Sequence, residues 1–143
     1  MIKIVKTPIN IEEVIKSVSN PKAGAIDAFI GTTRDNFEGK PVLFLEYEVY
    51  EEMALFTLQK LVNDAFSKWN LCSVSLVHRV GRVDIGEASI VIAVSSPHRN
   101  EAFEACRFLI DNVKKTVPIW KKEHFEGKNA WVGSEKDVKL GNL

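Results

Sequence analysis

Apolar residues recur along this chain at spacings that separate helices from strands. Over residues 51–69 they return every three or four positions, which is typical of a helix with one buried face. A second long helix is predicted over residues 100–116, because Pro118 cannot continue it. Asn10 is a suitable N-cap for a shorter helix that begins at Ile11. The stripes expected to be buried on the two long helices consist of Met53, Leu55, Phe56, Leu58, Leu61, Val62, Ala65 and Phe66, and of Ala102, Phe103, Cys106, Leu109, Ile110 and Val113.

Strand patterns fill most of the remaining chain. The continuous apolar run 90–94 indicates a central strand that is covered on both faces. Residues 32–41 and 81–86 are predicted to be loops, because glycine, proline and polar residues interrupt the pattern there. One strand alternates, with Leu43, Leu45, Tyr47 and Val49 on one face and Glu46 and Glu48 on the other. The predicted strands are residues 2–6, 24–31, 42–50, 71–80, 87–96, 119–125 and 129–132.

This order of elements predicts an α+β fold. Runs of strands separated by two long helices favour a two-layer structure with a mainly antiparallel sheet. A chain of 143 residues suits a single domain, which we expect to span residues 1–143.

Charge and composition exclude several classes of protein. Lysine plus arginine and aspartate plus glutamate each number 19, so the formal net charge is zero, which argues against a nucleic-acid-binding surface. The apolar runs are too short to cross a membrane and no signal peptide is evident, so we expect a cytoplasmic protein. Cys72 and Cys106 are expected to be free thiols, and no metal-ligand pattern is evident among the histidines.

The first candidate site lies before the second long helix, at residues 95–100. The N-terminus of a helix presents unpaired backbone N–H groups, and His98 and Arg99 would add positive charge for an anion such as a phosphate. The alternative is a capping turn whose side chains face solvent, which is the more common case.

The second candidate site consists of Lys114, near the end of that helix, and Lys121, beyond Pro118. A reversal of the chain at the proline would bring both amines to one cleft, where crowding and desolvation lower an amine's pKa and make it a nucleophile or base. The alternative is that these lysines offset the helix dipole in solvent, and Lys115, Lys122 and Lys128 are equally basic.

The third candidate is the segment 31–34, where small residues precede Arg34 and would let a ligand approach the backbone. The remaining polar residues favour structural roles: His78, His124, Glu46 and Glu48 show no acid–base or metal-ligand grouping. On these residues alone, a binding module for a small phosphorylated ligand is favoured over an enzyme. A phosphohydrolase using Arg99 and Asn100 is a further alternative.

The chain resembles a known family, the large subunits of molybdopterin synthase. The resemblance covers about residues 24–132, and the order and spacing of its motifs make it specific. The motifs read AFIGTTR at 28–34, LEY at 45–47, HRVG at 78–81, SPHR at 96–99 followed by AFEA at 102–105, and PIWKKE at 118–123.

The resemblance implies an α/β hammerhead fold with an additional small antiparallel β subdomain. It also implies a homodimer with a small ubiquitin-like carrier subunit at each far end, which together form a heterotetramer. The carrier's Gly-Gly C-terminus, as a thiocarboxylate, would supply two sulfurs to cyclic pyranopterin monophosphate and form the dithiolene of molybdopterin. No cofactor or metal is implied.

The family's functional residues are transferred by motif. Lys114 and Lys121 match its essential lysines, either of which could attack or stabilise charge. The substrate-binding residues implied by the motifs are Phe29, Thr32, Thr33, Arg34, His98, Arg99, Lys122 and Glu123. Two departures are noted: Thr32-Thr33 stand where some relatives carry a lysine beside the arginine, and Lys136 stands near an arginine of relatives. We expect one cationic crevice built from both ends of the second long helix.

Overall fold

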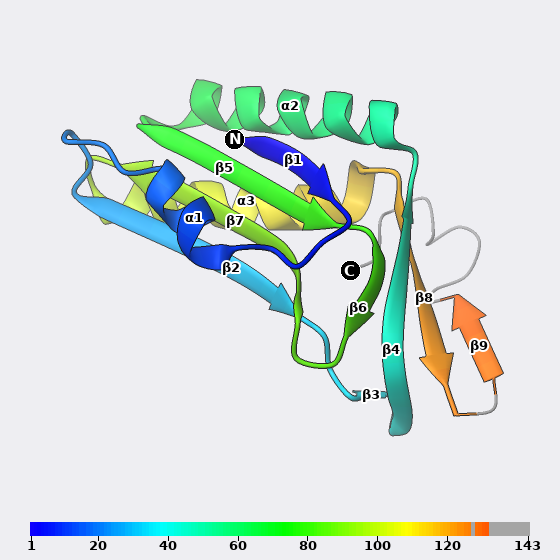
Figure 1. Cartoon of the computed structure of the whole chain (residues 1–143). Coiled ribbons are helices and arrows are strands. Elements are labelled where there is room, and N and C mark those ends of the chain that lie inside the picture. Colours follow the sequence, from blue (N-terminus) through cyan, green and yellow to red (C-terminus); the bar gives the residue numbers. More distant parts are fainter. Residues whose placement is uncertain (127, 132–143) are drawn as a thin grey trace.

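The computed structural model describes residues 1–126 and the backbone of 128–131. Two sheets and three helices make up this described part (Figure 1). The helices are α1 (Ile11–Ser17), α2 (Glu51–Lys68) and α3 (Arg99–Thr116). The strands are β1 (Ile2–Val5), β2 (Ala25–Thr32), β3 (Asn36–Phe37), β4 (Lys40–Val49), β5 (Ser73–Arg79), β6 (Gly81–Asp84), β7 (Ala88–Ser96), β8 (Ile119–Phe125) and β9 (Lys128–Trp131). The predicted α+β class is confirmed.

The first sheet has the strand order β1-β5-β7-β2. Only β1 and β5 pair in parallel; the other neighbours are antiparallel, as the sequence predicted. Helices α2 and α3 lie on one face and α1 on the other (Figure 1). Strand β7 is therefore central and covered on both faces, which explains the continuous apolar run at 90–94.

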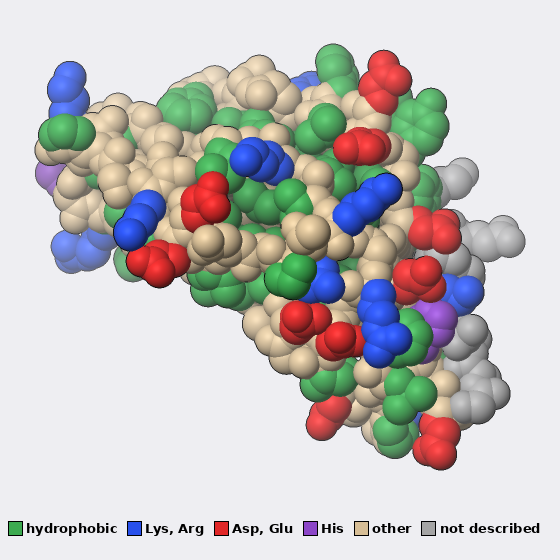
Figure 2. Space-filling model, viewed as in Figure 1, with side chains coloured by type: hydrophobic (Ala, Val, Ile, Leu, Met, Phe, Trp, Pro, Cys, Tyr) green, Lys and Arg blue, Asp and Glu red, His purple; other side chains and the backbone are tan. Residues whose placement is uncertain are grey.

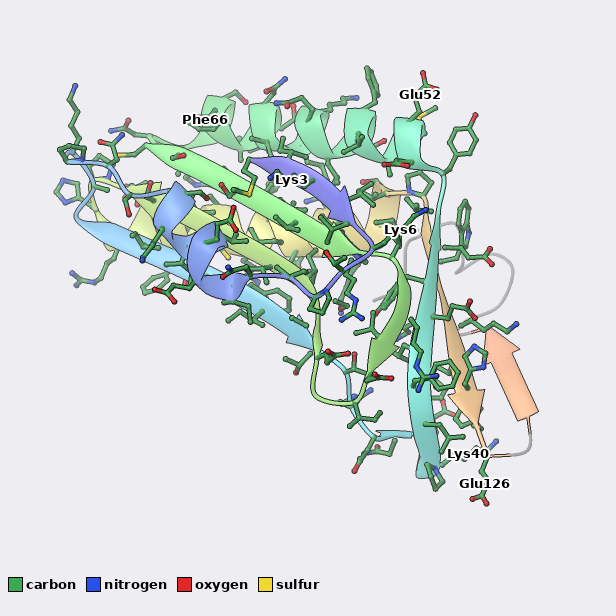
Figure 3. All side chains as sticks on the ribbon, viewed as in Figure 1. Lys3, Lys6, Lys40, Glu52, Phe66 and Glu126 are labelled. Carbon is green, nitrogen blue, oxygen red and sulfur yellow. The ribbon has the colours of Figure 1, made fainter. Side chains whose placement is uncertain are left out.

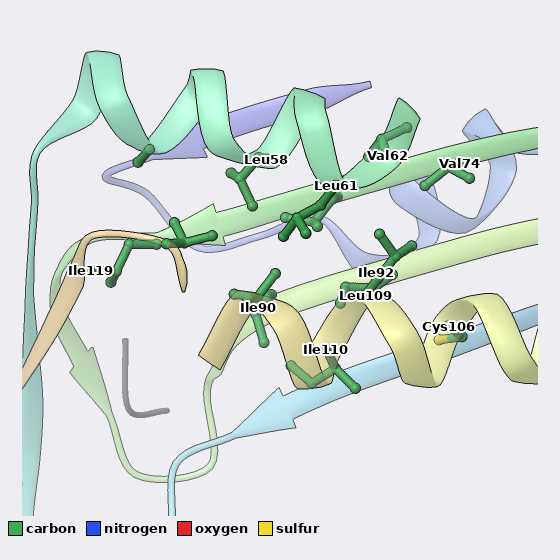
Figure 4. Packing of buried hydrophobic residues seen from close by; sticks show 14 of the residues in the cluster. Leu58, Leu61, Val62, Val74, Ile90, Ile92, Cys106, Leu109, Ile110 and Ile119 are labelled. Atoms are coloured by element: carbon green, nitrogen blue, oxygen red, sulfur yellow. The ribbon is translucent and has the colours of Figure 1, made fainter. Parts of the chain in front are cut away.

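Alternation along β5 and β7 divides the core into two clusters. Ile90 and Ile92 point into the larger cluster beneath α2 and α3 (Figure 4), while Val91 packs with Val14 beneath α1. Asn10 caps α1 as predicted, since its side chain accepts a hydrogen bond from the Glu13 backbone N–H at 3.1 Å.

The predicted helix stripes are wider than the buried faces. On α2 the outermost members Met53, Phe56 and Phe66 are exposed, and Phe66 is labelled in Figure 3. On α3 the side chain of Phe103 is likewise exposed. Apolar type alone overestimates the buried arc, because residues at the edge of a helical stripe can face solvent. The residues that α2 does bury are Ala54, Leu58, Leu61, Val62 and Ala65.

The second sheet contains two strands that the sequence analysis assigned to loops. β3 forms a hairpin with β4, and β6 pairs with the next part of the same β4 edge, opposite the edge that pairs with β8. The β3–β4 turn uses two residues of positive φ, Glu38 and Gly39, a conformation that matches the twist of a two-residue hairpin. Both strands are short, with two and four residues, so neither shows a hydrophobic period. Lys40 and Glu126 mark the far end of this sheet (Figure 3).

The β4 strand changes face because of an irregularity in its pairing with β8 between Val42 and Phe44. The predicted single apolar face is therefore wrong at Leu43, which is 52% exposed, while Leu45 and Tyr47 are buried. This bulge sets which side chains of β4 face the first sheet and the end of α3.

Among the described residues, no helix combines the length and the hydrophobicity that a membrane-spanning helix needs.

Candidate active site

A cavity of about 330 Å³ lies where the two sheets meet the C-terminal end of α3. Both sheets and the helix contribute to its wall, so residues far apart in sequence converge there. The lining residues are Phe29, Ile30, Gly31, Thr32, Arg34, Asn36, Val42, Leu45, Tyr47, Ser89, Ile90, Ile110, Lys114, Lys121 and Glu123. The predicted meeting of Lys114 with Lys121 is thus observed, and Arg34 joins them.

Strand β8 carries Lys121 and Glu123 on its inward face. Lys121 lies opposite Tyr47 and Glu123 opposite Leu45, so all four side chains point the same way. The Lys121 side chain is only 12% exposed and that of Glu123 only 3%. Their charged atoms, Lys121 Nζ and Glu123 Oε1, are 3.8 Å apart, while Glu123 Oε2 has no hydrogen-bond partner within the described residues. The pair is buried and loosely joined.

Burial lowers the pKa of Lys121, and the positive charges of Lys114 and Arg34 lower it further, against the opposing effect of Glu123. Burial likewise raises the pKa of Glu123, against the opposing charges of Lys121 and Arg34. Both shifts favour the neutral forms, an amine and a carboxylic acid. The cavity therefore holds an amine able to accept a proton nearer neutral pH than an ordinary lysine.

Lys114 differs from Lys121 in its environment. It lies in the last turn of α3, where the helix dipole favours a cation, and its side chain is exposed although it lines the cavity. The two amines are consequently unequal: Lys121 is desolvated in the wall and Lys114 stands at the mouth.

The segment after β2 supplies Arg34, and the strand itself supplies Phe29 and Thr32. Thr33 does not line the cavity. Its side chain is buried, and its hydroxyl donates to the backbone oxygen of Glu87 at 3.2 Å. Of the residues that the family motif implied for this loop, Thr33 is thus a structural anchor and Arg34 faces the site.

Sequence reasoning missed three polar residues of the cavity wall, Asn36, Tyr47 and Ser89. The Tyr47 hydroxyl forms a hydrogen bond with Ser89, whose Oγ donates to the Gly31 backbone oxygen at 3.3 Å. These two hydrogen bonds join the two sheets. Burial raises the pKa of Tyr47 to about 12, so the hydroxyl stays neutral. Its place opposite Lys121 follows from strand register, which no local pattern encodes.

Behind Tyr47 lies His78, which is fully buried. Burial lowers its pKa to about 4, partly offset by the hydrogen bond between its Nδ1 and the Arg79 backbone oxygen at 2.7 Å. The rings of Tyr47 and His78 meet edge to face at 5.2 Å. His78 is thus a neutral core residue, as the sequence analysis favoured. His124 and Glu46, to which the sequence analysis also gave structural roles, form a hydrogen bond of 2.9 Å on the outer face of the second sheet.

His98 and Arg99 lie in a different hollow, lined by Gly24, Pro97, His98, Arg99, Asn100 and Phe103. α3 has 18 residues and is about 27 Å long, and it separates this hollow from the two lysines. The expectation that one chain joins both ends of the helix in a single crevice is therefore wrong. His98 is the N-cap residue of α3 and makes no side-chain capping bond, and the binding of an anion in this hollow stays a prediction.

Other basic residues lie outside the cavity. Lys122 pairs across the strand with Glu46, and alternation places it on the outer face of β8. Lys115 is exposed and is not among the lining residues. Lys136 lies outside the described residues, as do Val132 and the side chain of Lys128.

Acidic and basic side chains are interspersed over the face shown in Figure 2. The described residues contain no cluster of histidine, cysteine or carboxylate ligands suited to a metal ion.

Comparison with known proteins points to one family. The model of the MoaE protein family matches residues 4–116. The molybdopterin synthase catalytic subunit of Bacillus subtilis is 49% identical over 136 residues, which cover 95% of this chain and 87% of that protein. Among solved structures, molybdopterin synthase from Staphylococcus aureus superposes with a TM-score of 0.87 at 38% identity, covering 92% of this chain and 96% of the other. A complex of subunits 1 and 2 of the molybdopterin-converting factor from Helicobacter pylori shares the fold, with a TM-score of 0.78 at 22% identity over 94% of this chain and 91% of the other.

Proposed function

The chain belongs to the MoaE protein family, and we propose that it is the catalytic subunit of a molybdopterin synthase. In this proposal it moves two sulfur atoms from the C-terminal thiocarboxylate of a small ubiquitin-like carrier to cyclic pyranopterin monophosphate. The product is the dithiolene of molybdopterin. Free thiols at Cys72 and Cys106 suit the reducing cytoplasm, where we place the reaction.

The observation that carries the proposal is the desolvated amine of Lys121 in a cavity that also presents Lys114 and Arg34. Sulfur transfer from a thiocarboxylate needs positive charge for the anionic donor and for the phosphate, and a group that moves protons. Lys114 and Arg34 provide the positive charge, and Lys121 beside the buried carboxyl of Glu123 provides the group that moves protons.

The contrast between the lysines suggests their roles. Lys121, with its lowered pKa, takes and returns protons as the pterin side chain changes. Lys114, exposed at the mouth, meets the incoming carrier and stabilises negative charge on its C-terminal group. In each transfer the thiocarboxylate sulfur bonds to a side-chain carbon of the pterin, a carbon–oxygen bond at that carbon breaks, and the acyl–sulfur bond breaks; the displaced oxygen leaves in water, on the carrier or on the phosphate of the opening ring. The carrier leaves as a carboxylate, whose new oxygen comes from the substrate or from water.

A second copy of the chain would bring His98 and Arg99 to the cavity. β2 is an edge strand of the first sheet, and Ile26 and Ile30, which share one of its faces, are exposed. Such an edge invites pairing with another strand. The start of β2 adjoins the His98 hollow, because the Gly24 backbone N–H donates to the Ser96 oxygen, and its end leads to Arg34.

Antiparallel pairing of two β2 strands about a twofold axis places the start of each beside the end of the other. β2 has eight residues and is about 26 Å long, close to the length of α3. The partner's His98 and Arg99 hollow would then face Arg34 and the lysines, and the phosphate would be held between two copies. We propose this homodimer as the core, with one carrier bound at each far end to form a heterotetramer.

Reconstitution tests the activity. The protein is mixed with thiocarboxylated carrier and cyclic pyranopterin monophosphate, and dithiolene product is measured by its oxidised fluorescent derivative. Product formation that depends on both reactants is expected. Tight carrier binding without product would favour a binding module, and phosphate release without carrier would favour a hydrolase; either result would overturn the proposal.

Subunit complementation tests the shared site. Lys114→Ala and Arg99→Ala variants are each expected to be impaired as homodimers. Co-expressed, they form mixed dimers in which one site has both residues intact, so about a quarter of wild-type activity should return. Activity that stays at the level of the separate variants would show that Arg99 serves its own chain or none.

A further inference from the structure

We infer that Arg79 and Glu87, which no family motif assigns to the site, are positioning residues that hold Arg34 at the cavity. The inference rests on the proposed function for the role of Arg34. Three linked contacts carry it. They are the ion pair between Arg79 and Glu87, a turn closed by Glu87, and two hydrogen bonds from Thr33, the residue before Arg34, to the Glu87 backbone oxygen.

The first contact is the ion pair between Arg79 at the end of β5 and Glu87 just before β7. Arg79 Nη1 is 3.3 Å from Glu87 Oε1, and the Arg79 side chain is only 10% exposed, against 36% for Glu87. Arg79 Nε and Nη1 have no hydrogen-bond partner within the described residues, so Glu87 is the counter-charge that the structure shows for it. A buried guanidinium costs free energy unless it is paired, and this ties Glu87 to the end of β5.

The second contact is the turn from Asp84 to Glu87. The Asp84 backbone N–H donates to the same Glu87 Oε1 at 3.0 Å, and the Glu87 N–H donates to the Asp84 oxygen at 3.0 Å. Gly86 has a φ of 82°, which favours glycine in this turn. The Glu87 carboxylate is therefore shared between the buried arginine and the turn backbone, and it fixes where the Glu87 carbonyl points.

The third contact passes this order to the loop of the cavity. The Glu87 carbonyl accepts from the Thr33 backbone N–H at 3.1 Å and from the Thr33 hydroxyl at 3.2 Å. The Gly86 N–H donates to the Thr33 oxygen at 2.9 Å. Thr33 is thereby fixed on three sides, and the next residue, Arg34, is exposed and lines the cavity. The exposed side chain of Arg34 gains its place from this backbone anchor.

The arrangement differs from a generic stabilising ion pair in what it supports. Removing the charge of Arg79 frees the carboxylate of Glu87, and the relaxed turn releases Thr33 and displaces Arg34. Lys121 and Glu123 lie on the second sheet and are not held by this chain of contacts. The loss should therefore fall on substrate binding more than on the chemical step.

The test is a double-mutant cycle between Arg79→Met and Arg34→Ala in the reconstituted assay. Arg79→Met should raise KM for cyclic pyranopterin monophosphate about tenfold and change kcat less than about threefold. In the Arg34→Ala background the same substitution should change KM less than about twofold, because the residue it positions is already gone. An equal effect in both backgrounds, or none in either, would overturn the inference.

A second variant and a control guard against simple misfolding. Glu87→Gln keeps an oxygen for the Asp84 N–H but loses the charge that holds Arg79, so it should raise KM in the same direction by a smaller factor. Arg82→Met is the matched control, because Arg82 pairs with Asp84 at 2.8 Å in an exposed ion pair, with side chains 62% and 54% exposed. An equal rise in KM for Arg82→Met would mean that any charge loss near the turn suffices, and the inference would fail.

Hydrogen exchange separates this inference from the proposed function. In Arg79→Met the Thr33 and Gly86 amides should exchange at least about tenfold faster, whether or not the wild-type protein makes product. Unchanged exchange at both amides would refute the positioning chain. Absence of product from the wild-type protein would instead refute the sulfur-transfer function.

Discussion

The two ends of α3 are both cationic, but they differ in what surrounds the charge. At the C-terminal end, Lys121 lies in the wall of a cavity beside buried Glu123, and burial shifts the pKa values of both. At the N-terminal end, His98 and Arg99 are exposed around an open hollow and meet unpaired backbone N–H groups. The C-terminal end can therefore tune proton transfer, whereas the N-terminal end can attract and orient an anion.

The largest effect is expected when the amine of Lys121 is removed from the enclosed end. Lys121→Met keeps the length and apolar stem of the side chain but cannot move a proton, so kcat should fall by about 10²–10⁴-fold. Arg99→Ala at the open end should mainly raise KM. Steady-state kinetics with the reconstituted carrier separates the two parameters.

Lys115→Met is the matched control for that experiment. Lys115 follows Lys114 on the same helix, is exposed and does not line the cavity. Its activity should match the wild type. A Lys121→Met enzyme that keeps wild-type kcat would remove the enclosed amine from the mechanism and make the two ends equivalent.

A smaller effect is expected from glycines that admit close approach at each end. At Gly31 a Cβ would lie 2.7 Å from Ile90 Cγ2 and 3.3 Å from Phe29 Cε1, so Gly31→Ala should press side chains into the cavity. At Gly24 a Cβ would overlap the Pro97 backbone oxygen, which cannot rotate away. Each overpacked variant should lose about 1–3 kcal/mol of unfolding free energy, with Gly24→Ala the worse.

Urea unfolding measures both losses, and carrier-dependent activity distinguishes them. Gly31→Ala should also reduce activity beyond its loss of stability, since it alters the cavity wall directly. If Gly24→Ala proved as stable as the wild type, the close approach that shapes the open hollow would be contradicted.

The smallest expected effect is a pH shift from Glu123→Gln. Ionised Glu123 raises the pKa of Lys121, so its removal should lower that pKa further. In the proposed mechanism the neutral amine of Lys121 is the active form, so activity should fall as the pH drops through the Lys121 pKa. The acid limb of the kcat profile should therefore move to lower pH in Glu123→Gln.

Glu46→Gln provides the comparison, because Glu46 lies on the outer face of the same sheet opposite Lys122. Its acid limb should stay in place. A shift toward higher pH in Glu123→Gln would show that the carboxyl acts on Lys121 in the opposite sense to the one deduced from the structure.

Much of the fold was predictable because long elements leave periodic patterns. The helices at 51–69 and 100–116 and the central strand 87–96 were found to within a few residues. β3 and β6 were not, since each is short and is a strand because it pairs with β4. The face of Leu43 was wrong for a related reason: a bulge depends on pairing with another strand.

The candidate site was predictable in part. Lys114 and Lys121 meet because the chain reverses after α3, as Pro118 indicated. Tyr47 and Ser89 could not be found locally, since register across sheets places them. The separation of Arg99 from Lys114 could have been deduced, because a helix of that length holds its ends apart whatever the family motif implies.

The short connection between β2 and β3 has a mechanical consequence. β2 belongs to the first sheet and β3 to the second, and Arg34 lies between them, so the connection is a hinge between the two sheets. Any sliding of one sheet against the other changes the gap between Arg34 and Lys121. A ligand bound by both sheets would therefore make the protein more rigid, and this rigidity should be measurable at sites that the ligand does not contact.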